Sequence, residues 1–285
     1  MDSFDECGIR YLTPSSINAF RDNPAYWVMR FLYGVQTTSP AFIRSIAVKA
    51  GVKSMLYERK LGHAEDRALE TFQHRIGVSG MDWEDPGVQD EYDNVLPMFD
   101  LAVKALDGLG LIKMPTAMDM PTHVWADGVT APFLSSPDIV YEDCVVDLKP
   151  TKRCPSKLPF RDLAAMAIHS RAREGVVIHN IYATNKKYAS YAPLPSQLDE
   201  AWADLVTDAF ALQTFVFSAE SREHALAMTP LNRDHFYWSD ESLEKARSIL
   251  KLTQERMHGL NNAAGTRRLR APGTGDPFGD MLPDH

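Results

Sequence analysis

Apolar residues recur every three or four positions through the first 110 residues, as they do along amphipathic helices. The hydroxyl residues and proline of Thr13–Ser16 predict a helix start. This helix is expected to break near Asn23 and Pro24 and to end at Gly34. Further helices are expected at about 41–61, 64–75 and 87–108. The stretch from about 13 to about 110 is therefore predicted to be mostly helical.

The pattern changes to strand-like alternation after residue 110. Residues 118–126 and 129–134 alternate between apolar and polar positions and are expected to form strands. Two short apolar segments, 139–141 and 144–146, flank the acidic pair Glu142 and Asp143. This arrangement predicts a tight hairpin of buried strands.

Helices and strands both follow the hairpin. A helix is expected from Pro159 to about Ala172, and residues 176–184 give the strongest buried-strand signal in the chain. Residues 188–191 are expected to pair with that strand. Two long helices are expected at about 197–219 and 240–258.

This order of elements predicts one α/β domain over about 1–258, with a helical N-terminal part at about 13–110 and a core at about 111–258. Residues 259–285 are rich in glycine, proline, asparagine and charge, and are expected to form a flexible tail.

Composition and charge bound the class of protein. Of the 285 residues, 45% are hydrophobic and 24% are charged, which is ordinary for a soluble globular protein. No apolar run approaches the roughly 20 residues of a membrane span, and the acidic N-terminus is unlike a secretory signal. We therefore expect a cytoplasmic protein with no membrane partner. The net charge of −8 argues against general adhesion to nucleic acid, but it allows a local basic groove.

The candidate chemistry lies in the hairpin. Asp138 stands at the mouth of the first strand, and Asp147 and Lys149 lie two apart on the second. A period of two places Asp147 and Lys149 on one face, with Leu148 pointing into the core. Two carboxylates and an ammonium on one face are costly unless something binds there. The expected occupant is a hard divalent cation, with the lysine beside it to meet an anionic substrate.

These residues resemble the PD-(D/E)xK nuclease superfamily, in its RecB-like and phage exonuclease branch. Pro137-Asp138 matches the "PD" element, and Asp147-Leu148-Lys149 matches "(D/E)xK". Residues 12–20 are similar to the "S-x-S-x-hydrophobic" helix entry of that branch. The resemblance covers about residues 12–192 and implies a restriction-endonuclease-like core, a small mixed β-sheet flanked by helices.

The resemblance implies a metal-dependent phosphodiesterase. Asp138, Asp147 and the main-chain carbonyl of Leu148 would hold one or two Mg²⁺ or Mn²⁺ ions, and Lys149 would orient or deprotonate the attacking water. Oxygen ligands suit these ions rather than zinc. No iron–sulfur cluster is expected, because Asn23 stands at the usual first cysteine position and no cysteine follows Cys154.

Ser136 and Ser45 replace common glycines of the family, and three site positions also depart from its pattern. Lys49 stands where relatives carry a glutamate or histidine ligand, Ala165 replaces a glutamine, and His169 replaces a tyrosine. An ammonium cannot coordinate a cation. Lys49 would either repel one or pair with Asp138 or Asp147 and take over the electrostatic role of the metal.

Basic residues near the hairpin are candidates for nucleic-acid contacts. A groove that follows phosphates and a solvated loop are both compatible with the run Lys149, Lys152, Arg153, Lys157 and Arg161. The pair Lys186 and Lys187 fits a charged hairpin tip or a DNA backbone contact. The basic tail residues Arg267, Arg268 and Arg270 fit a flexible basic patch or a nucleic-acid contact.

Two hypotheses from different classes follow. The first is a Mg²⁺- or Mn²⁺-dependent DNA exonuclease of phage or mobile-element recombination and replication, acting on duplex ends or single strands in the host cytoplasm if phage-encoded. The second is a nuclease-fold protein with weakened or lost catalysis that serves in DNA binding or assembly. A structure-specific endonuclease is a weaker third reading. The resemblance also implies a homo-oligomer and a recombination or single-strand-binding partner.

Overall fold

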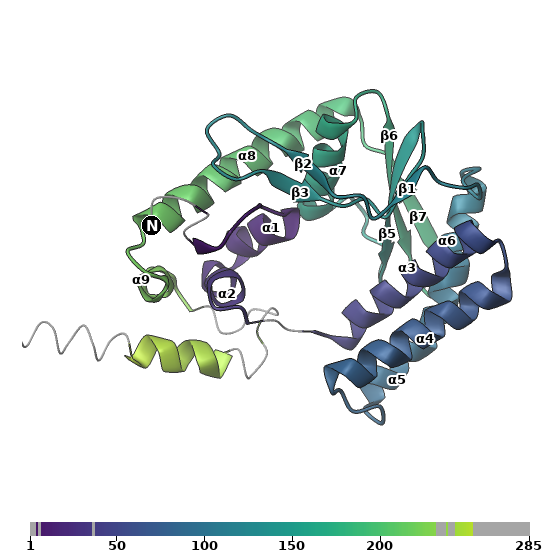
Figure 1. Ribbon diagram of the computed structural model, residues 1–285, viewed down its shortest axis with the longest axis horizontal. Helices are drawn as coiled ribbons and strands as arrows, with labels where there is room; N and C mark the ends of the chain where they lie inside the picture. The colour runs from purple at the N-terminus through teal and green to yellow at the C-terminus, as the bar shows by residue number, and fades with distance from the viewer. Residues whose placement is uncertain (1–3, 5–6, 36–37, 232–237, 239–242, 253–285) are drawn as a thin grey trace, which may run out of the picture.

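The computed structural model describes residue 4, residues 7–35, 38–231 and 238, and residues 243–252. Helices gather toward the two ends of an elongated molecule, and a mixed β-sheet lies between them (Figure 1). The named helices are α1 (Pro14–Asp22), α2 (Pro24–Trp27), the π-helix η2 (Val28–Leu32), α3 (Pro40–Glu58), α4 (Leu61–Ser79), α5 (Pro86–Asp93), α6 (Val95–Gly108), α7 (Phe160–Ala172), α8 (Pro195–Ser218) and α9 (Arg222–Ala227). This mixed α/β architecture with a helical N-terminal part confirms the expected fold class.

Seven strands form two sheets within the described residues. The five-stranded sheet has the order β1-β4-β5-β6-β7, and β2 pairs with β3 in a separate ribbon. Only β5 and β6 run parallel, and α7 is the crossover between them. The strands are β1 (Ala117–Met118), β2 (Thr122–Val124), β3 (Phe133–Ser135), β4 (Ile139–Val140), β5 (Cys144–Pro150), β6 (Val177–Ala183) and β7 (Tyr188–Tyr191).

The predicted hairpin is confirmed. Ile139 pairs with Val146 and Val140 with Val145 in the antiparallel register of β4 and β5. The turn closes through a hydrogen bond from the Tyr141 N–H to the Cys144 carbonyl. This register fixes Asp138, at the start of β4, opposite the middle of β5.

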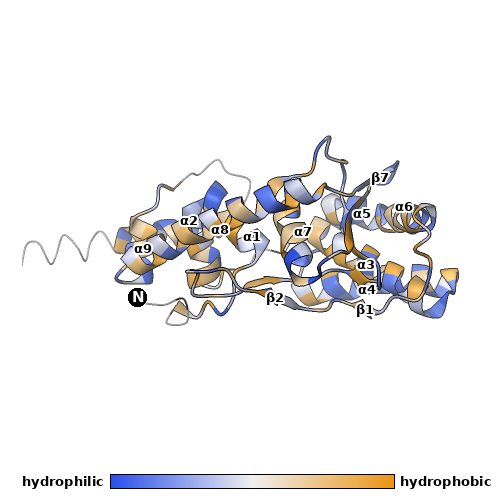
Figure 2. Ribbon diagram, turned by 90° about the horizontal axis from the view of Figure 1, so that it is seen from above, coloured by the Kyte–Doolittle hydropathy of each residue, from blue (hydrophilic) through white to orange (hydrophobic). Residues whose placement is uncertain are grey.

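The five-stranded sheet separates two groups of helices. Val146 and Leu148 of β5 pack in a core with α3, α4, α5 and α6, which we term the α3–α6 core. Val145 faces the other way and packs with Met166 of α7 and Leu198 of α8. A further core joins α1, α2, α7 and α8. The two groups lie toward opposite ends of the molecule (Figure 2).

The predicted break in the first helix is confirmed at Asn23. Its N–H closes α1 on the Ala19 carbonyl, and its side chain accepts from the Tyr26 N–H to begin α2. Pro24 follows at the first position of α2, where its missing N–H removes no helical hydrogen bond.

Other expected elements differ in extent. The single helix expected at 87–108 is two helices, because the Asn94 side chain donates to the Asp90 carbonyl and interrupts the helix there. The long strands expected at 118–126 and 129–134 are the short β1, β2 and β3. Of the helix expected at 240–258, residues 243–252 are described and helical, and the predicted tail at 259–285 lies outside the described residues.

No described helix has both the length and the apolarity needed to span a membrane.

The tight packing of Gly51 on α3 against α4 gives a first prediction. A Cβ built on Gly51 would lie 2.9 Å from the Ala68 Cβ and 3.0 Å from the Ala64 carbonyl oxygen. Gly51→Ala should therefore lower the free energy of unfolding by about 1–3 kcal/mol, measured by urea denaturation. Gly77→Ala is the control, since nothing lies within 4 Å of its added Cβ. It should be neutral or stabilising by about 0.5–1 kcal/mol, and equal losses in both variants would contradict the packing explanation.

Candidate functional site

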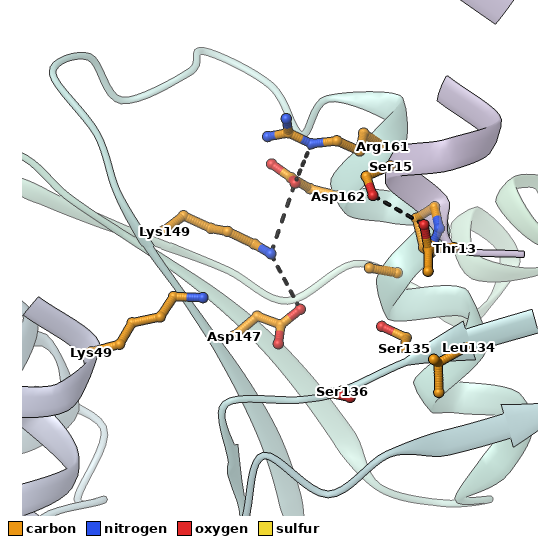
Figure 3. Close-up of a pocket in the computed structure, with 12 residues that line it drawn as sticks. Thr13, Ser15, Lys49, Leu134, Ser135, Ser136, Asp147, Lys149, Arg161 and Asp162 are labelled. Carbon is orange, nitrogen blue, oxygen red and sulfur yellow. Dashed lines mark hydrogen bonds and ion pairs between the residues drawn. The ribbon is translucent and has the colours of Figure 1, made fainter. Parts of the chain in front are cut away.

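A cavity of about 330 Å³ opens where the hairpin meets α3, α7 and the start of α1. Charged and hydroxyl side chains from these separate elements face into it (Figure 3). It is lined by Thr13, Pro14, Ser15, Lys49, Leu134, Ser135, Ser136, Asp147, Lys149, Arg161, Asp162 and Ala165. The structure thus brings together Lys49, Asp147, Lys149, Arg161 and Ala165 from the residues singled out in the sequence.

Asp138 lies behind this cavity and is held by the hairpin itself. Its side chain is 7% exposed. One carboxylate oxygen, Oδ2, accepts from the Leu148 N–H at 2.7 Å and lies 2.8 Å from the Lys49 Nζ. The Asp138 N–H in turn donates to the Asp147 Oδ1 at 3.3 Å. The two carboxylates are therefore neighbours across the strand pair.

Asp147 and Lys149 share one face of β5, as the period of two predicts. The Lys149 Nζ lies 3.4 Å from the Asp147 Oδ2 and 3.9 Å from the Asp162 Oδ1. Leu148 points the opposite way and is fully buried in the α3–α6 core. The alternation along β5 therefore places the charged side chains in the cavity and Leu148 in the core.

Asp162 is the charged site residue that the sequence reasoning missed. It lies in the first turn of α7 and is buried, and it accepts a hydrogen bond from the Tyr182 hydroxyl. An acidic residue in the first turn of a helix has an ordinary explanation in the helix dipole, so the sequence alone gave no signal of burial. Ala165 follows one turn later and lines the cavity.

His169 is buried beside Asp147 but does not form a catalytic triad. Its Nε2 lies 3.2 Å from the Ser135 Oγ and 3.7 Å from the Asp147 Oδ2. A serine–histidine–aspartate triad places the hydroxyl and the carboxylate on different ring nitrogens. Here both approach the same nitrogen, and Nδ1 has no hydrogen-bond partner among the described residues. The arrangement positions Asp147 rather than activating Ser135.

The neighbouring charges favour the ionised forms of Asp147 and Lys149. Burial raises the pKa of Asp147, but Lys149, His169 and Lys49 outweigh this effect and hold the pKa well below its ordinary value. Burial lowers the pKa of Lys149, but Asp147, Asp162 and Asp138 together raise it above its ordinary value. Lys149 is therefore an ammonium at neutral pH, which suits a charge clamp better than a general base.

The residues do not fit a divalent metal as they are arranged. Three carboxylates (Asp138, Asp147 and Asp162) face three cations (Lys49, Lys149 and Arg161). The Asp138 Oδ2 already accepts from two donors, one of them the Lys49 ammonium. In the part of the chain that the structure describes, no three His, Cys, Asp or Glu side chains are grouped to hold a metal ion. The charge of the cluster is balanced without one.

The other basic candidates lie in two further places. Lys152, Arg153 and Lys187 line a second cavity of about 420 Å³, together with Lys186. Parallel strands end at the same edge of a sheet, so the loops after β5 and β6 meet there. Lys157 lies instead on a third cavity beside Leu158 and Pro159. The tail residues Arg267, Arg268 and Arg270 lie outside the described residues.

Comparison with known proteins adds little to this geometry. No family model matches the chain, and no curated protein matches it. A crystal structure of a protein from Eubacterium rectale named "Putative exonuclease" matches with a TM-score of 0.49 and 12% identity, over 72% of this chain and 82% of that one. The protein SSO0001 matches with a TM-score of 0.30 and 12% identity, over 67% of this chain and 85% of that one. Both likenesses are too weak to support a function for this chain.

The lowered pKa of Asp147 gives a second prediction. A carboxyl whose folded pKa lies below the unfolded value of about 3.9 stabilises the fold above that pH and loses this effect as the pH falls through the folded pKa. Asp147→Asn should cost about 3 kcal/mol of unfolding free energy at pH 7, and the gap to wild type should narrow below about pH 4. Urea denaturation from pH 7 to pH 3 measures this.

Asp143→Asn is the control on the same hairpin. Asp143 is largely exposed and lies 3.7 Å from Lys113, so its replacement should change stability little at any of these pH values. A deficit in Asp147→Asn that stayed constant from pH 7 to pH 3 would contradict the prediction.

Proposed function

We propose that this chain binds the phosphate backbone of DNA at the cavity beside β5. It would be a nuclease-type protein with a closed hydrolytic centre, in which the Lys49 ammonium pairs with Asp138 and leaves no place for a metal ion. The observation that carries this proposal is the Lys49–Asp138 ion pair, 2.8 Å long, beside an open cavity that still presents Lys149 and Arg161. Cations and hydroxyls suffice to hold a phosphodiester. The resemblance to PD-(D/E)xK nucleases supports DNA as the ligand.

The lining of the cavity suits a phosphate group. Arg161 projects from the start of α7 with its side chain 53% exposed, and its Nε lies 3.3 Å from the Asp162 Oδ1. Thr13, which caps α1, and Ser15 add hydroxyls beside the N–H groups at the start of that helix. Arg161 is therefore the cation best placed to meet a phosphate from solvent.

The second cavity extends the basic surface for a polyanion. Arg153, Lys186 and Lys187 form no ion pair with any described carboxylate, while Lys152 is held 2.6 Å from Asp90 and 2.9 Å from Glu91. Unpaired cations gathered at one sheet edge favour a ligand with several phosphates. The overall charge of −8 confines such binding to this local surface.

Binding of labelled DNA tests this proposal. In EDTA, fluorescence anisotropy should show a Kd that weakens as salt rises, for duplex or single-stranded DNA. Arg161→Gln should weaken binding about tenfold and reduce the salt slope by about 0.9, because one phosphate contact is lost. Arg153→Gln should act in the same direction.

Arg75→Gln on α4 is the matched control. Arg75 is exposed and lies outside the residues of both cavities, so this change should leave the Kd within about twofold. The absence of binding in wild type, or equal losses in all three variants, would rule the proposal out.

Metal-dependent DNA exonuclease activity is the second candidate. It is favoured by the convergence of Asp138, Asp147 and Lys149 on one hairpin. The setting of this activity would be phage or mobile-element recombination, with Mg²⁺ or Mn²⁺ as the cofactor. A homo-oligomer and a recombination or single-strand-binding partner belong to the same proposal.

Digestion of end-labelled linear duplex with Mg²⁺ or Mn²⁺ separates the two candidates. A closed centre predicts no product above the level of the Asp147→Asn variant, because no bound metal lowers the pKa of a water molecule. Shortened strands in wild type that disappear in Asp147→Asn would instead establish the exonuclease. Cutting of closed circular DNA would indicate an endonuclease.

A further inference from the structure

We infer that the Lys49 ammonium stands in for a divalent cation at this site, and that replacing it with a carboxylate opens a Mn²⁺- or Mg²⁺-binding centre. This inference deepens the proposed function by naming the group that closes the centre. It rests on the position of Lys49 relative to Asp138 and Asp147, and its test measures metal binding rather than DNA binding.

The Lys49 side chain reaches the centre from α3, whereas Lys149 reaches it from β5. The Lys49 side chain is 25% exposed and lines the cavity. Figure 3 shows the ammonium groups of Lys49 and Lys149 both directed toward Asp147. A carboxylate at position 49 would therefore face the two carboxylates that Lys49 now faces.

The two hairpin carboxylates need positive counter-charges close by. Asp138 and Asp147 are 5% and 3% exposed, and a hydrogen bond from the Asp138 N–H to Asp147 holds them side by side. Neighbouring buried carboxylates without a counter-charge are strongly unfavourable. Lys49 now supplies the counter-charge to Asp138 and Lys149 supplies it to Asp147. Without Lys49, a hard cation with oxygen ligands is the group that restores the balance.

Lys53 on the same helix is a matched control for Lys49, because its carboxylate partner is exposed to solvent. Lys53 lies one turn after Lys49 on α3, and both of its ammonium contacts are to Asp119, whose side chain is 62% exposed. Lys53→Glu makes the same change of charge one turn away. It leaves Asp138 and Asp147 with their present partners, so it separates the effect of position from that of net charge.

Isothermal titration with MnCl₂ tests the inference on the full chain. Wild type and Lys53→Glu should show no saturable Mn²⁺ site. Lys49→Glu should bind one Mn²⁺ per chain at least tenfold more tightly than wild type, and Mn²⁺ should raise its Tm by several degrees. Adding Asp147→Asn to Lys49→Glu should remove this binding.

Two results would overturn the inference. One is a wild type that binds Mn²⁺ as tightly as Lys49→Glu, with loss of the site in Asp147→Asn. The other is a folded Lys49→Glu variant that binds no Mn²⁺. If the DNA proposal is wrong, the anisotropy of labelled DNA will not rise when the protein is added in EDTA. The Mn²⁺ titrations do not measure this.

Lys49→Met covers the case in which Lys49→Glu does not fold. It removes the ammonium without adding a third carboxylate, so its Tm should be below that of wild type in EDTA and should recover in part with Mn²⁺. An unchanged Tm in EDTA, or a loss that Mn²⁺ does not reduce, would also contradict the inference.

Discussion

The ion pair between Lys49 and Asp138 ties helix α3 to the point where the chain passes from one core to the other. Phe133 of β3 packs with α7 and α8, whereas Ile139 of β4 packs in the α3–α6 core. Asp138 lies between them and is buried, so its charge must be met locally. The Lys49 ammonium and the Leu148 N–H meet it together. They fix the hairpin against α3, and the cavity depends on this because the same strands place its charged residues.

The charges on β5 are compatible with its central position only because they cancel. Asp147 and Lys149 face α7, where Asp162 and His169 complete the cluster. An incoming phosphate would have to compete with two carboxylates for the Lys149 ammonium. The charge of the half-exposed Arg161 is less fully neutralised, since Asp162 is its one described carboxylate partner. Recognition of a phosphate would therefore begin at Arg161 and involve Lys149 only at closer approach.

What could be predicted from the sequence was local. The β4–β5 hairpin follows from two apolar segments around an acidic turn, and the opposite directions of Leu148 and Asp147 follow from the period of a strand. Long-range contacts were not accessible in the same way. The break at Asn94 depends on its own side chain, which also accepts a hydrogen bond from Asn185 in the loop between β6 and β7. The burial of Asp162 depends on Tyr182 of β6 in the same manner. Even for Lys49, the sequence left repulsion of a cation and pairing with either aspartate open.

An ammonium in place of a metal ion would preserve the fold but change the chemistry. Either group neutralises buried carboxylates, so the hairpin, α3 and the cavity can keep their geometry. A divalent ion also lowers the pKa of bound water and stabilises the charge of a reacting phosphate, which an ammonium on a carbon chain does far less. Lys149 does not replace this function as a base, because its acidic neighbours raise its pKa. Holding a phosphodiester needs only cations and hydroxyls, so binding would persist in a centre where an ammonium stood in place of the metal ion needed for cleavage.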